Sequence, residues 1–182
     1  MKLVVIGTGY VGLVSGLCFA EFGFETICVD KDKEKLSKLK KGECPFFEPG
    51  LQELLLKHVN LTKRFSFSEN LSNSMNEANV VFITVGTPSR RLESDADLSD
   101  VYEVAKEISK SIYDYCVVAI KSTVPVGTTR KIQEIISQNV SDDKFDVVSN
   151  PEFLREGSAI NDFLCPDRVV IGTENKKSEN IM

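Results

Sequence analysis

The chain has 182 residues, of which 42% are hydrophobic and 27% charged, and its formal net charge at pH 7 is −5. This composition predicts one globular domain with a sizeable core and excludes a collagen-like or disordered chain. The acidic balance argues against nucleic acid as a partner, because nucleic-acid-binding domains usually carry a basic face.

Apolar runs and helical spacing predict alternating strands and helices in the first half of the chain. Strands are expected at residues 2–6, 25–29, 64–68 and 80–85. Helices are expected around the apolar residues 14, 17, 18 and 22, over residues 31–41 and over residues 51–59, with a loop at residues 44–50.

The alternation continues in the second half. A polar loop at residues 89–97 precedes a helix with apolar residues at 101, 104, 105, 108 and 112, which Asp97 or Ser99 could cap. A strand at 116–120, a helix at 128–139 and strands at 145–148 and 168–171 follow. Alternation of this kind predicts an α/β fold with a doubly wound, mainly parallel sheet in three layers. We expect this domain to span residues 1–174 and residues 175–182 to form a polar tail.

A glycine-rich motif links the first strand to the first helix. Residues 7–12 read Gly-Thr-Gly-Tyr-Val-Gly, the G-x-G-x-x-G pattern of dinucleotide-binding domains. Gly7 permits the tight turn, Gly9 lets a pyrophosphate approach the backbone, and Gly12 allows close packing of helix on strand. The alternative is an ordinary strand-to-helix turn. In this context the motif predicts a Rossmann-like NAD-binding domain.

Asp30 ends the second predicted strand and follows the last glycine of the motif by 18 positions (30 − 12). A carboxylate there accepts hydrogen bonds from the ribose hydroxyls of the cofactor and repels a 2′-phosphate. The expected cofactor is therefore NAD rather than NADP, although Lys31, Lys33 and Lys35 nearby count against this preference.

Three later motifs also follow predicted strands: Val-Gly-Thr-Pro at 85–88, Lys-Ser-Thr-Val-Pro-Val at 121–126 and Asn-Pro-Glu-Phe-Leu-Arg-Glu-Gly at 150–157. Together with the glycine motif they resemble the UDP-glucose/GDP-mannose dehydrogenase family over residues 2–172. Residues 162–172, Asp-Phe-Leu-Cys-Pro-Asp-Arg-Val-Val-Ile-Gly, are most similar to its UDP-glucose branch, and the GDP-mannose branch remains an alternative. The resemblance implies oxidation of the primary alcohol of UDP-glucose to a carboxylate by two NAD in turn, through a cysteine-bound intermediate.

The resemblance also implies roles for individual residues. Glu152 would be the catalytic general acid/base, and Thr123 would help to position a catalytic water. The cofactor would contact Gly7, Gly9, Tyr10, Val11, Gly12, Asp30, Lys35, Thr87, Thr123 and Glu156. The UDP-sugar would contact Glu152, Phe153, Leu154, Arg155 and Glu156.

Simpler interpretations of the same residues stay open. Thr87 before Pro88 could be ordinary turn chemistry, and Ser122 or Thr123 could cap the next helix. Glu152 and Glu156 could form a solvated charge pair with Arg155. His58, the only histidine, is expected at the surface, far from every motif.

The five cysteines contain no CxxC pair, which predicts no metal site and a reduced, cytoplasmic chain. The apolar start of the chain is interrupted by glycines and Glu21, unlike a secretory signal, and no stretch approaches the ~20 apolar residues of a membrane span.

None of these cysteines matches the family's nucleophile motif, which lies in a second domain. We therefore expect a fragment that is inactive without the C-terminal half of the enzyme, whose full-length form is expected to be a homo-oligomer. The alternative is a stand-alone or degenerate NAD-binding module without turnover.

Overall fold

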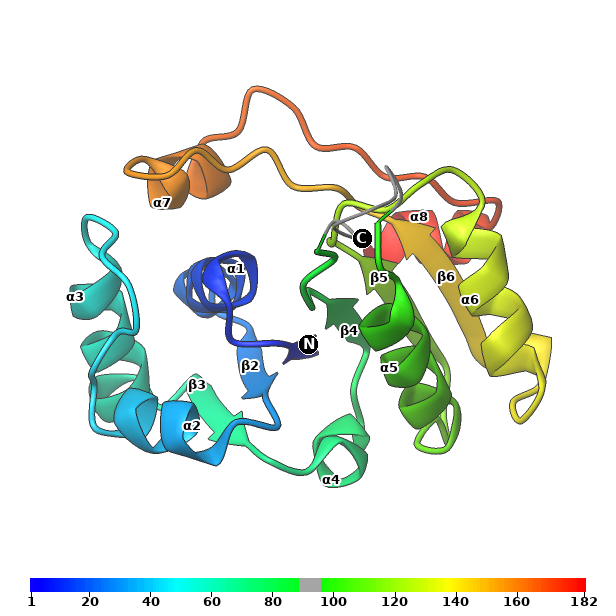
Figure 1. Ribbon diagram of the computed structural model, residues 1–182, viewed down its shortest axis with the longest axis horizontal. Helices are drawn as coiled ribbons and strands as arrows, with labels where there is room; N and C mark the ends of the chain where they lie inside the picture. The colour runs from blue at the N-terminus through cyan, green and yellow to red at the C-terminus, as the bar shows by residue number, and fades with distance from the viewer. Residues whose placement is uncertain (89–95) are drawn as a thin grey trace.

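The computed structural model describes residues 1–88 and 96–182 and contains a six-stranded sheet in the order β3-β2-β1-β4-β5-β6 (Figure 1). Every neighbouring pair of strands is parallel. The strands are β1 (Lys2–Ile6), β2 (Glu25–Val29), β3 (Phe65–Ser68), β4 (Val80–Ile83), β5 (Cys116–Ile120) and β6 (Phe145–Ser149). The expected doubly wound parallel sheet is confirmed.

Helices cover both faces of this sheet. One face carries α1 (Tyr10–Glu21), α2 (Lys33–Lys40) and α3 (Leu51–Leu56), and the other carries α4 (Leu71–Met75), α5 (Ser99–Ser109) and α6 (Thr128–Ser137). Because successive side chains of a strand point to opposite faces, β1 supplies both layers. Leu3 and Val5 pack with α1, whereas Val4 and Ile6 pack with α5. The fold is therefore three-layered.

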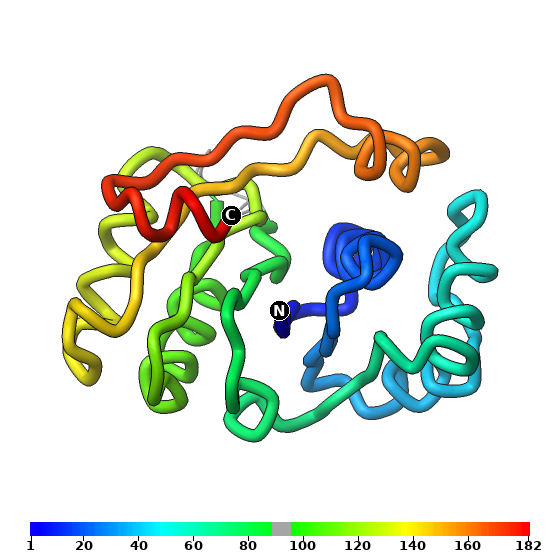
Figure 2. Tube along the Cα trace, turned by 180° about the vertical axis from the view of Figure 1, so that it is seen from behind, coloured from blue at the N-terminus to red at the C-terminus, as the bar shows by residue number. Residues whose placement is uncertain are grey.

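The segment after β6 crosses the side of the molecule that carries α1 and then returns (Figure 2). It contains α7 (Ala159–Leu164), where the ring of Phe163 packs edge-on against Phe19 of α1, with 5.1 Å between ring centroids. The returning part, residues 165–175, holds no strand: residues 168–171 were expected as one, but this part has only an isolated antiparallel bridge, between Ser149 and Gly172. The prediction of a last strand at residues 168–171 is therefore wrong.

Other boundaries also differ from the expectation. Helix α2 begins at Lys33 rather than residue 31, because Asp32 caps it by accepting a hydrogen bond from the Lys35 N–H at 2.9 Å. The short helices α4 and α7 were not expected. Residues 175–182, expected as a polar tail, form helix α8 (Lys176–Ile181), and Ile181 packs against the core on the α1 side. The loop expected at 89–97 lies outside the described residues except for its last two positions.

His58 is not at the surface. The chain passes from α3 into a π-helical turn, η1 (Lys57–Leu61), and His58 in this turn is only 1% exposed. Its ring nitrogens lie 2.9 Å from Thr62 Oγ1 and 2.7 Å from Glu21 Oε2.

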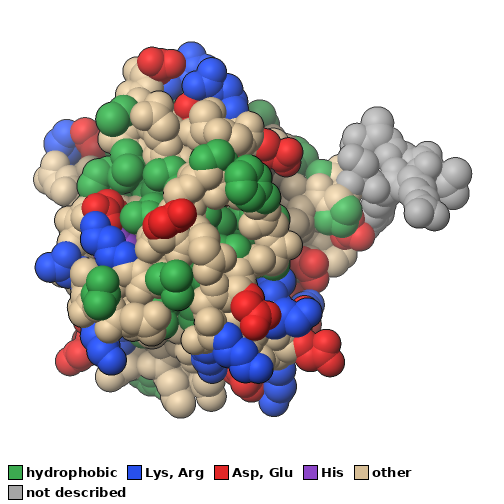
Figure 3. Space-filling model, turned by 90° about the vertical axis from the view of Figure 1, so that its left-hand side faces the viewer, with side chains coloured by type: hydrophobic (Ala, Val, Ile, Leu, Met, Phe, Trp, Pro, Cys, Tyr) green, Lys and Arg blue, Asp and Glu red, His purple; other side chains and the backbone are tan. Residues whose placement is uncertain are grey.

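Figure 3 views the molecule from the side that carries α3, where acidic and basic side chains are intermingled. Within the described part of the chain, no helix has both the length and the apolar character needed to cross a membrane.

Candidate functional site

The glycine motif forms a tight turn between β1 and α1. Gly7 has a φ of +106°, and its N–H donates to the carbonyl of Val29 at 2.8 Å, which ties the turn to the end of β2. A Cβ on Gly12 would lie 2.0 Å from the Gly7 carbonyl oxygen, so only glycine fits there. A Cβ on Gly9 would meet nothing within 4 Å, so this position faces open space. This geometry is consistent with the roles expected of Gly7 in the turn, of Gly9 near a pyrophosphate and of Gly12 in helix packing.

Asp30 is held in place by several hydrogen bonds at the end of β2. Its Oδ2 accepts from the Thr8 N–H at 2.8 Å, the Thr8 hydroxyl at 2.5 Å and the Lys35 ammonium at 2.9 Å, and its Oδ1 accepts from the Asp32 N–H at 3.0 Å. Burial alone would raise the pKa of this carboxyl, but the hydrogen bonds outweigh burial and lower the pKa to about 2. The group is therefore an anion at neutral pH.

A pocket of about 400 Å³ lies beside this turn. Gly7, Gly9, Asp30 and Lys35 line one side of it, and the end of β4 with Gly86 and the first turns of α5 line the other. The pocket is therefore bordered by the glycine motif, Asp30 and the end of β4. Such a crevice at the carboxyl ends of parallel strands, where the strand order reverses, is where doubly wound folds bind nucleotides.

The segments after β4 and β5 meet next to this pocket. The Thr87 hydroxyl donates to the carbonyl of Thr123 at 3.0 Å, and the Ser122 hydroxyl donates to the carbonyl of Val85 at 2.6 Å. Thr123 does not cap α6, whose capping position is Gly127. Thr123 is exposed and Thr87 is half-buried, so both are accessible to a ligand.

The segment after β6 brings a carboxylate to the same edge of the sheet. Asn150 is buried and holds the segment in place, because its N–H donates to the Ile120 carbonyl and its side-chain amide to the Val170 carbonyl, each at 2.9 Å. Glu152 is half-buried, and its Oε2 accepts from the Leu154 N–H at 2.6 Å. Glu156 is exposed two residues beyond Leu154.

Arg155 is paired within its own segment. Its guanidinium donates to both carboxylate oxygens of Asp162 in α7, at 2.6 and 3.1 Å, and its N–H donates to the same side chain at 2.9 Å. These hydrogen bonds lower the pKa of Asp162 and raise that of Arg155. The structure therefore pairs Arg155 with Asp162 rather than with Glu152 or Glu156. The neighbouring Phe153 ring is exposed and lies 4.7 Å from the Arg168 guanidinium.

The sequence predicts no functional role for Lys121, which directly follows β5, but the structure shows that this lysine is buried. Its side chain is only 6% exposed, and its ammonium lies 5.9 Å and 5.4 Å from the ring centres of Phe82 and Phe163. Burial lowers its pKa to about 8, against the opposing attraction of Glu152. It lines a largely apolar pocket of about 330 Å³ that also contains Glu152.

Tyr10 and Val11 open α1, as expected, and both are half-buried. The Tyr10 hydroxyl donates to Glu48 at 2.6 Å, and burial, followed by this contact, raises the Tyr10 pKa. Glu48, like Thr8, was missed by sequence reasoning, although Glu48-Pro49-Gly50 is a turn signal of the kind that fixes a loop. The described residues contain no group of three or more His, Cys, Asp or Glu side chains that could hold a metal ion.

Many families of nucleotide-binding domains share this fold, and comparison with protein families shows to which of them the chain belongs. The model of the UDP-glucose/GDP-mannose dehydrogenase family, NAD binding domain, matches residues 1–182. The chain belongs to this family. The four motifs at the sheet edge lie within the matched residues, and the expected family membership is confirmed.

Curated relatives of this dehydrogenase family match across nearly the whole chain. A UDP-glucose 6-dehydrogenase of Rhizobium meliloti (strain 1021) is 53% identical over 174 residues, which cover 96% of this chain and 40% of that protein. The UDP-glucose 6-dehydrogenase TuaD of Bacillus subtilis (strain 168) is 46% identical over 183 residues, covering 100% of this chain and 39% of that protein. The chain therefore spans about 40% of the length of these relatives.

Solved structures of family members have the same fold. A UDP-glucose dehydrogenase from Pyrobaculum islandicum superposes with a TM-score of 0.93 and 36% identity, over 99% of this chain and 42% of that one. A GDP-mannose dehydrogenase from Pseudomonas aeruginosa gives a TM-score of 0.94 and 34% identity, over 100% of this chain and 43% of that one. Fold similarity thus does not separate the two branches, whereas the curated relatives above belong to the UDP-glucose branch.

Proposed function

We propose that this chain is the NAD-binding part of a UDP-glucose 6-dehydrogenase, which converts UDP-glucose, water and two NAD⁺ into UDP-glucuronate, two NADH and protons. The observation that carries this proposal is the meeting of the glycine turn, Asp30, Thr87, Thr123 and Glu152 at one edge of the sheet. The UDP-glucose branch is favoured by relatives of that name at up to 53% identity. The two NAD⁺ would take up the four electrons of the primary alcohol as two hydrides.

The residues at the glycine turn fit NAD. The open space at Gly9 leaves room for a pyrophosphate near the first N–H groups of α1, while the filled space at Gly12 keeps the helix close to β1. Val11, Asp30 and Lys35 would hold the adenosine half, and Tyr10 would also contact the cofactor. The negative charge of Asp30 disfavours the extra phosphate of NADP.

The nicotinamide half would lie toward the ends of β4, β5 and β6. There Thr87, Thr123 and Glu156 would line the ring, and NAD⁺ would accept hydride from the substrate carbon. Glu152 would move protons as general acid/base, and Thr123 would help to orient the water that is consumed. Residues 152–156 would also contact the UDP-sugar.

This chain supplies no suitable thiol for the covalent step. Burial raises the pKa of both Cys18 and Cys116 to about 12, and it raises the pKa of Cys28 and Cys44 as well. Cys165 is exposed at the end of α7, but it does not match the family's nucleophile motif. Since a thiolate is the reactive form, we propose that the remainder of the enzyme supplies the nucleophile and that the chain alone does not turn over. We further propose a cytoplasmic location and a homo-oligomeric full-length enzyme.

Calorimetric titration with NAD and NADP tests the cofactor proposal. The native chain is expected to bind NAD more tightly, and Asp30→Ala to lose the preference, whereas Asp114→Ala, an exposed Asp to Ala change in a turn, should keep it. Equal affinity of the native chain for the two cofactors would contradict the proposal.

A chimera tests the reaction. Residues 1–182 of this chain replace the corresponding segment of the Rhizobium meliloti relative, and NADH formation from UDP-glucose is followed by absorbance. The chimera is expected to turn over, and Glu152→Gln in the chimera to lower kcat by at least about 100-fold, the usual contribution of a general acid/base. A folded chimera that binds NAD without turnover would favour the alternative, a degenerate NAD-binding module.

A further inference from the structure

Glu48 is a buried carboxylate in the loop between α2 and α3, and it accepts hydrogen bonds from three residues in two distant parts of the chain. The residue is 4% exposed. Its Oε2 accepts hydrogen bonds from the Tyr10 hydroxyl at 2.6 Å and the Gly157 N–H at 2.8 Å, and its Oε1 accepts from the Ala159 N–H at 2.8 Å. These donors lie 38, 109 and 111 positions away in sequence.

Among the residues that the structure describes, hydrogen bonds and not an ion pair hold the Glu48 carboxylate. In the part of the chain that the structure describes, no Lys, Arg or His side chain forms an ion pair with Glu48. Burial would raise its pKa, but the hydrogen bonds from Tyr10, Gly157 and Ala159 outweigh burial and lower it. A buried charge is tolerated only when its hydrogen-bonding capacity is satisfied, so the three donors explain why a glutamate can stand here.

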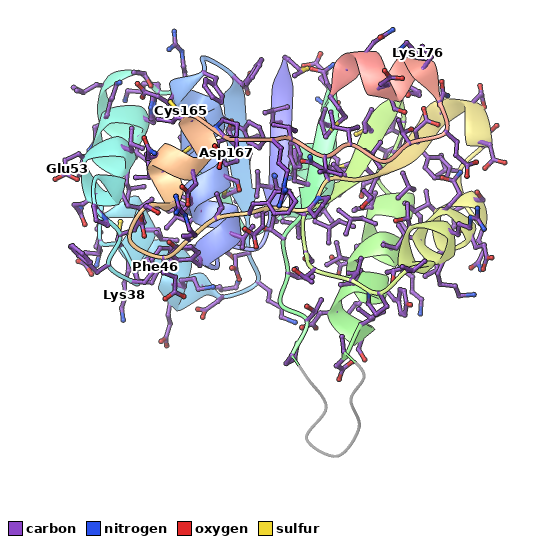
Figure 4. All side chains as sticks on the ribbon, turned by 90° about the horizontal axis from the view of Figure 1, so that it is seen from above. Lys38, Phe46, Glu53, Cys165, Asp167 and Lys176 are labelled. Atoms are coloured by element: carbon purple, nitrogen blue, oxygen red, sulfur yellow. The ribbon has the colours of Figure 1, made fainter. Side chains whose placement is uncertain are left out.

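The three donors belong to segments that flank the candidate site. Tyr10 is the first residue of α1, directly after the glycine turn. Gly157 follows Glu156 and turns the chain with a φ of +87°, and Ala159 begins α7. The loop that carries Glu48 also carries Phe46, whose ring packs on that of Tyr10 with 5.1 Å between centroids. Figure 4 shows Phe46 next to the turn that leads from β6 to α7.

We propose that Glu48 is a positioning residue that fixes residues 152–157 to the start of α1. It joins the segment that binds the pyrophosphate to the segment that carries Glu152 and Glu156, and so sets the separation between the two halves of the NAD site. This inference rests on the proposed function, because it assigns the fixed segment to the nicotinamide side.

Amide exchange tests the contact itself, without any ligand. Gly157 is an exposed residue, so its N–H should exchange rapidly unless Glu48 binds it. In the native chain we expect both the Gly157 and Ala159 amides to be protected. In Glu48→Gln the side chain presents an NH₂ group in place of one acceptor, and exchange at these two amides should rise about tenfold or more. The amide of Val118 in β5 should not change.

Glu43→Gln is the matched control, because Glu43 lies in the same loop, is exposed and undergoes the same substitution. It should leave all three amides at the native rates. Rapid exchange at Gly157 in the native chain would overturn the proposal, and this measurement does not depend on whether the Gln variant folds. Equal acceleration at Val118 and Gly157 in the variant would also overturn it, since that pattern indicates general destabilisation.

Ligand affinity separates positioning from a purely structural role. ADP carries the adenosine and pyrophosphate half of NAD and lacks the nicotinamide. Calorimetry on Glu48→Gln should show NAD affinity reduced roughly tenfold and ADP affinity within about twofold of native, because only the nicotinamide side depends on the fixed segment. An equal loss for both ligands, or no loss for NAD, would overturn the proposal. If the native chain itself binds no NAD, the proposed function fails, and amide exchange still decides whether Glu48 fixes the segment.

Discussion

Thr8 donates both its main-chain N–H and its hydroxyl to one carboxylate oxygen of Asp30, at 2.8 and 2.5 Å. Thr8 is fully buried inside the glycine turn, whereas Asp30 directly follows the neighbouring strand β2. The two hydrogen bonds make the turn and the strand end a single rigid unit. A ligand therefore meets a carboxylate that is already oriented and ionised, so less conformational entropy is lost on binding.

Because of this contact, the free energy of unfolding should vary with pH in the acid range. The pKa of Asp30 is lowered to about 2 in the folded chain, from an ordinary value of 3.8. The stabilisation is therefore complete above about pH 4 and is lost as the pH falls toward 2, where the folded state must take up the proton. We expect this group to contribute about 2 kcal/mol to the free energy of unfolding at pH 6.

Urea unfolding between pH 2 and 6 measures this contribution. Asp30→Asn should be less stable than the native chain at pH 6 and nearly equal to it at pH 2. Asp114→Asn is the control, because Asp114 is exposed and should leave the pH profile unchanged. A native and an Asp30→Asn profile that run parallel over this range would contradict the prediction.

Substitution by alanine should change the stability of the protein very differently at two glycines of the motif. Gly12→Ala places a methyl group 2.0 Å from the Gly7 carbonyl oxygen and 2.5 Å from Thr84 Oγ1, so the backbone must shift. We expect the free energy of unfolding to fall by about 3 kcal/mol or more. Gly9→Ala meets nothing within 4 Å and has an ordinary φ of −73°, so stability should change by less than about 1 kcal/mol.

The binding consequences distinguish the same pair. Gly9→Ala puts its methyl group where the pyrophosphate is proposed to approach, so NAD affinity should fall although the variant is folded. Thermal unfolding and NAD calorimetry on both variants provide the measurement. Retention of full NAD affinity in Gly9→Ala would remove the pyrophosphate from this position.

The sequence predicts the sheet, and the places of the glycine motif and Asp30 in it, because both depend on local signals. The glycine motif and Asp30 are fixed by their position next to a strand end, and β1, β4 and β5 are continuous apolar runs that only a sheet covered on both faces can bury. Residues 169–171 are apolar in the same way but form no strand. Apolar, β-branched composition fits a pleated surface, and whether a neighbouring strand is available to pair with is set by the tertiary fold.

Contacts between distant segments explain what was missed. Glu48 reads as one acidic residue in a loop, and its three donors become neighbours only when α7 packs beside α1. His58 reads as a polar residue in an exposed helix, yet Glu21, its partner 37 positions earlier, allows it to be buried. A polar residue is predicted at the surface unless its partner is known, and the partner is a tertiary feature.

The Glu21 carboxylate offers a comparison between a buried and an exposed partner. It binds the buried His58 ring at 2.7 Å and the exposed Lys57 ammonium at 2.7 and 2.8 Å. We expect His58→Ala to lower the free energy of unfolding by about 3 kcal/mol, because it leaves a cavity and breaks two partly buried hydrogen bonds. Lys57→Ala should cost less than about 1 kcal/mol, as exposed ion pairs do. Urea unfolding at pH 7 measures both, and a larger loss for Lys57→Ala would contradict the burial of His58.

The buried Lys121 ammonium destabilises the folded chain at neutral pH, whereas the ionised Asp30 stabilises it. Burial lowers the pKa of Lys121 to about 8 from 10.5, so the folded state disfavours the ammonium. Between pH 8 and 10.5 the unfolded chain binds more protons at this site than the folded chain, and stability attributable to Lys121 should rise with pH over that window. Below pH 8 the cost is present in full, about 3 kcal/mol.

Lys121→Met should remove this cost while keeping an unbranched side chain against Phe82 and Phe163. The free energy of unfolding at pH 7 is then expected to exceed that of the native chain, and the difference to shrink as the pH rises from 8 to 10.5. Lys110→Met, at an exposed position after α5, is the control and should show neither effect. If Lys121→Met were less stable than the native chain at pH 7, the ammonium would be a stabilising group, and the attraction of Glu152 would have to exceed the cost of burial.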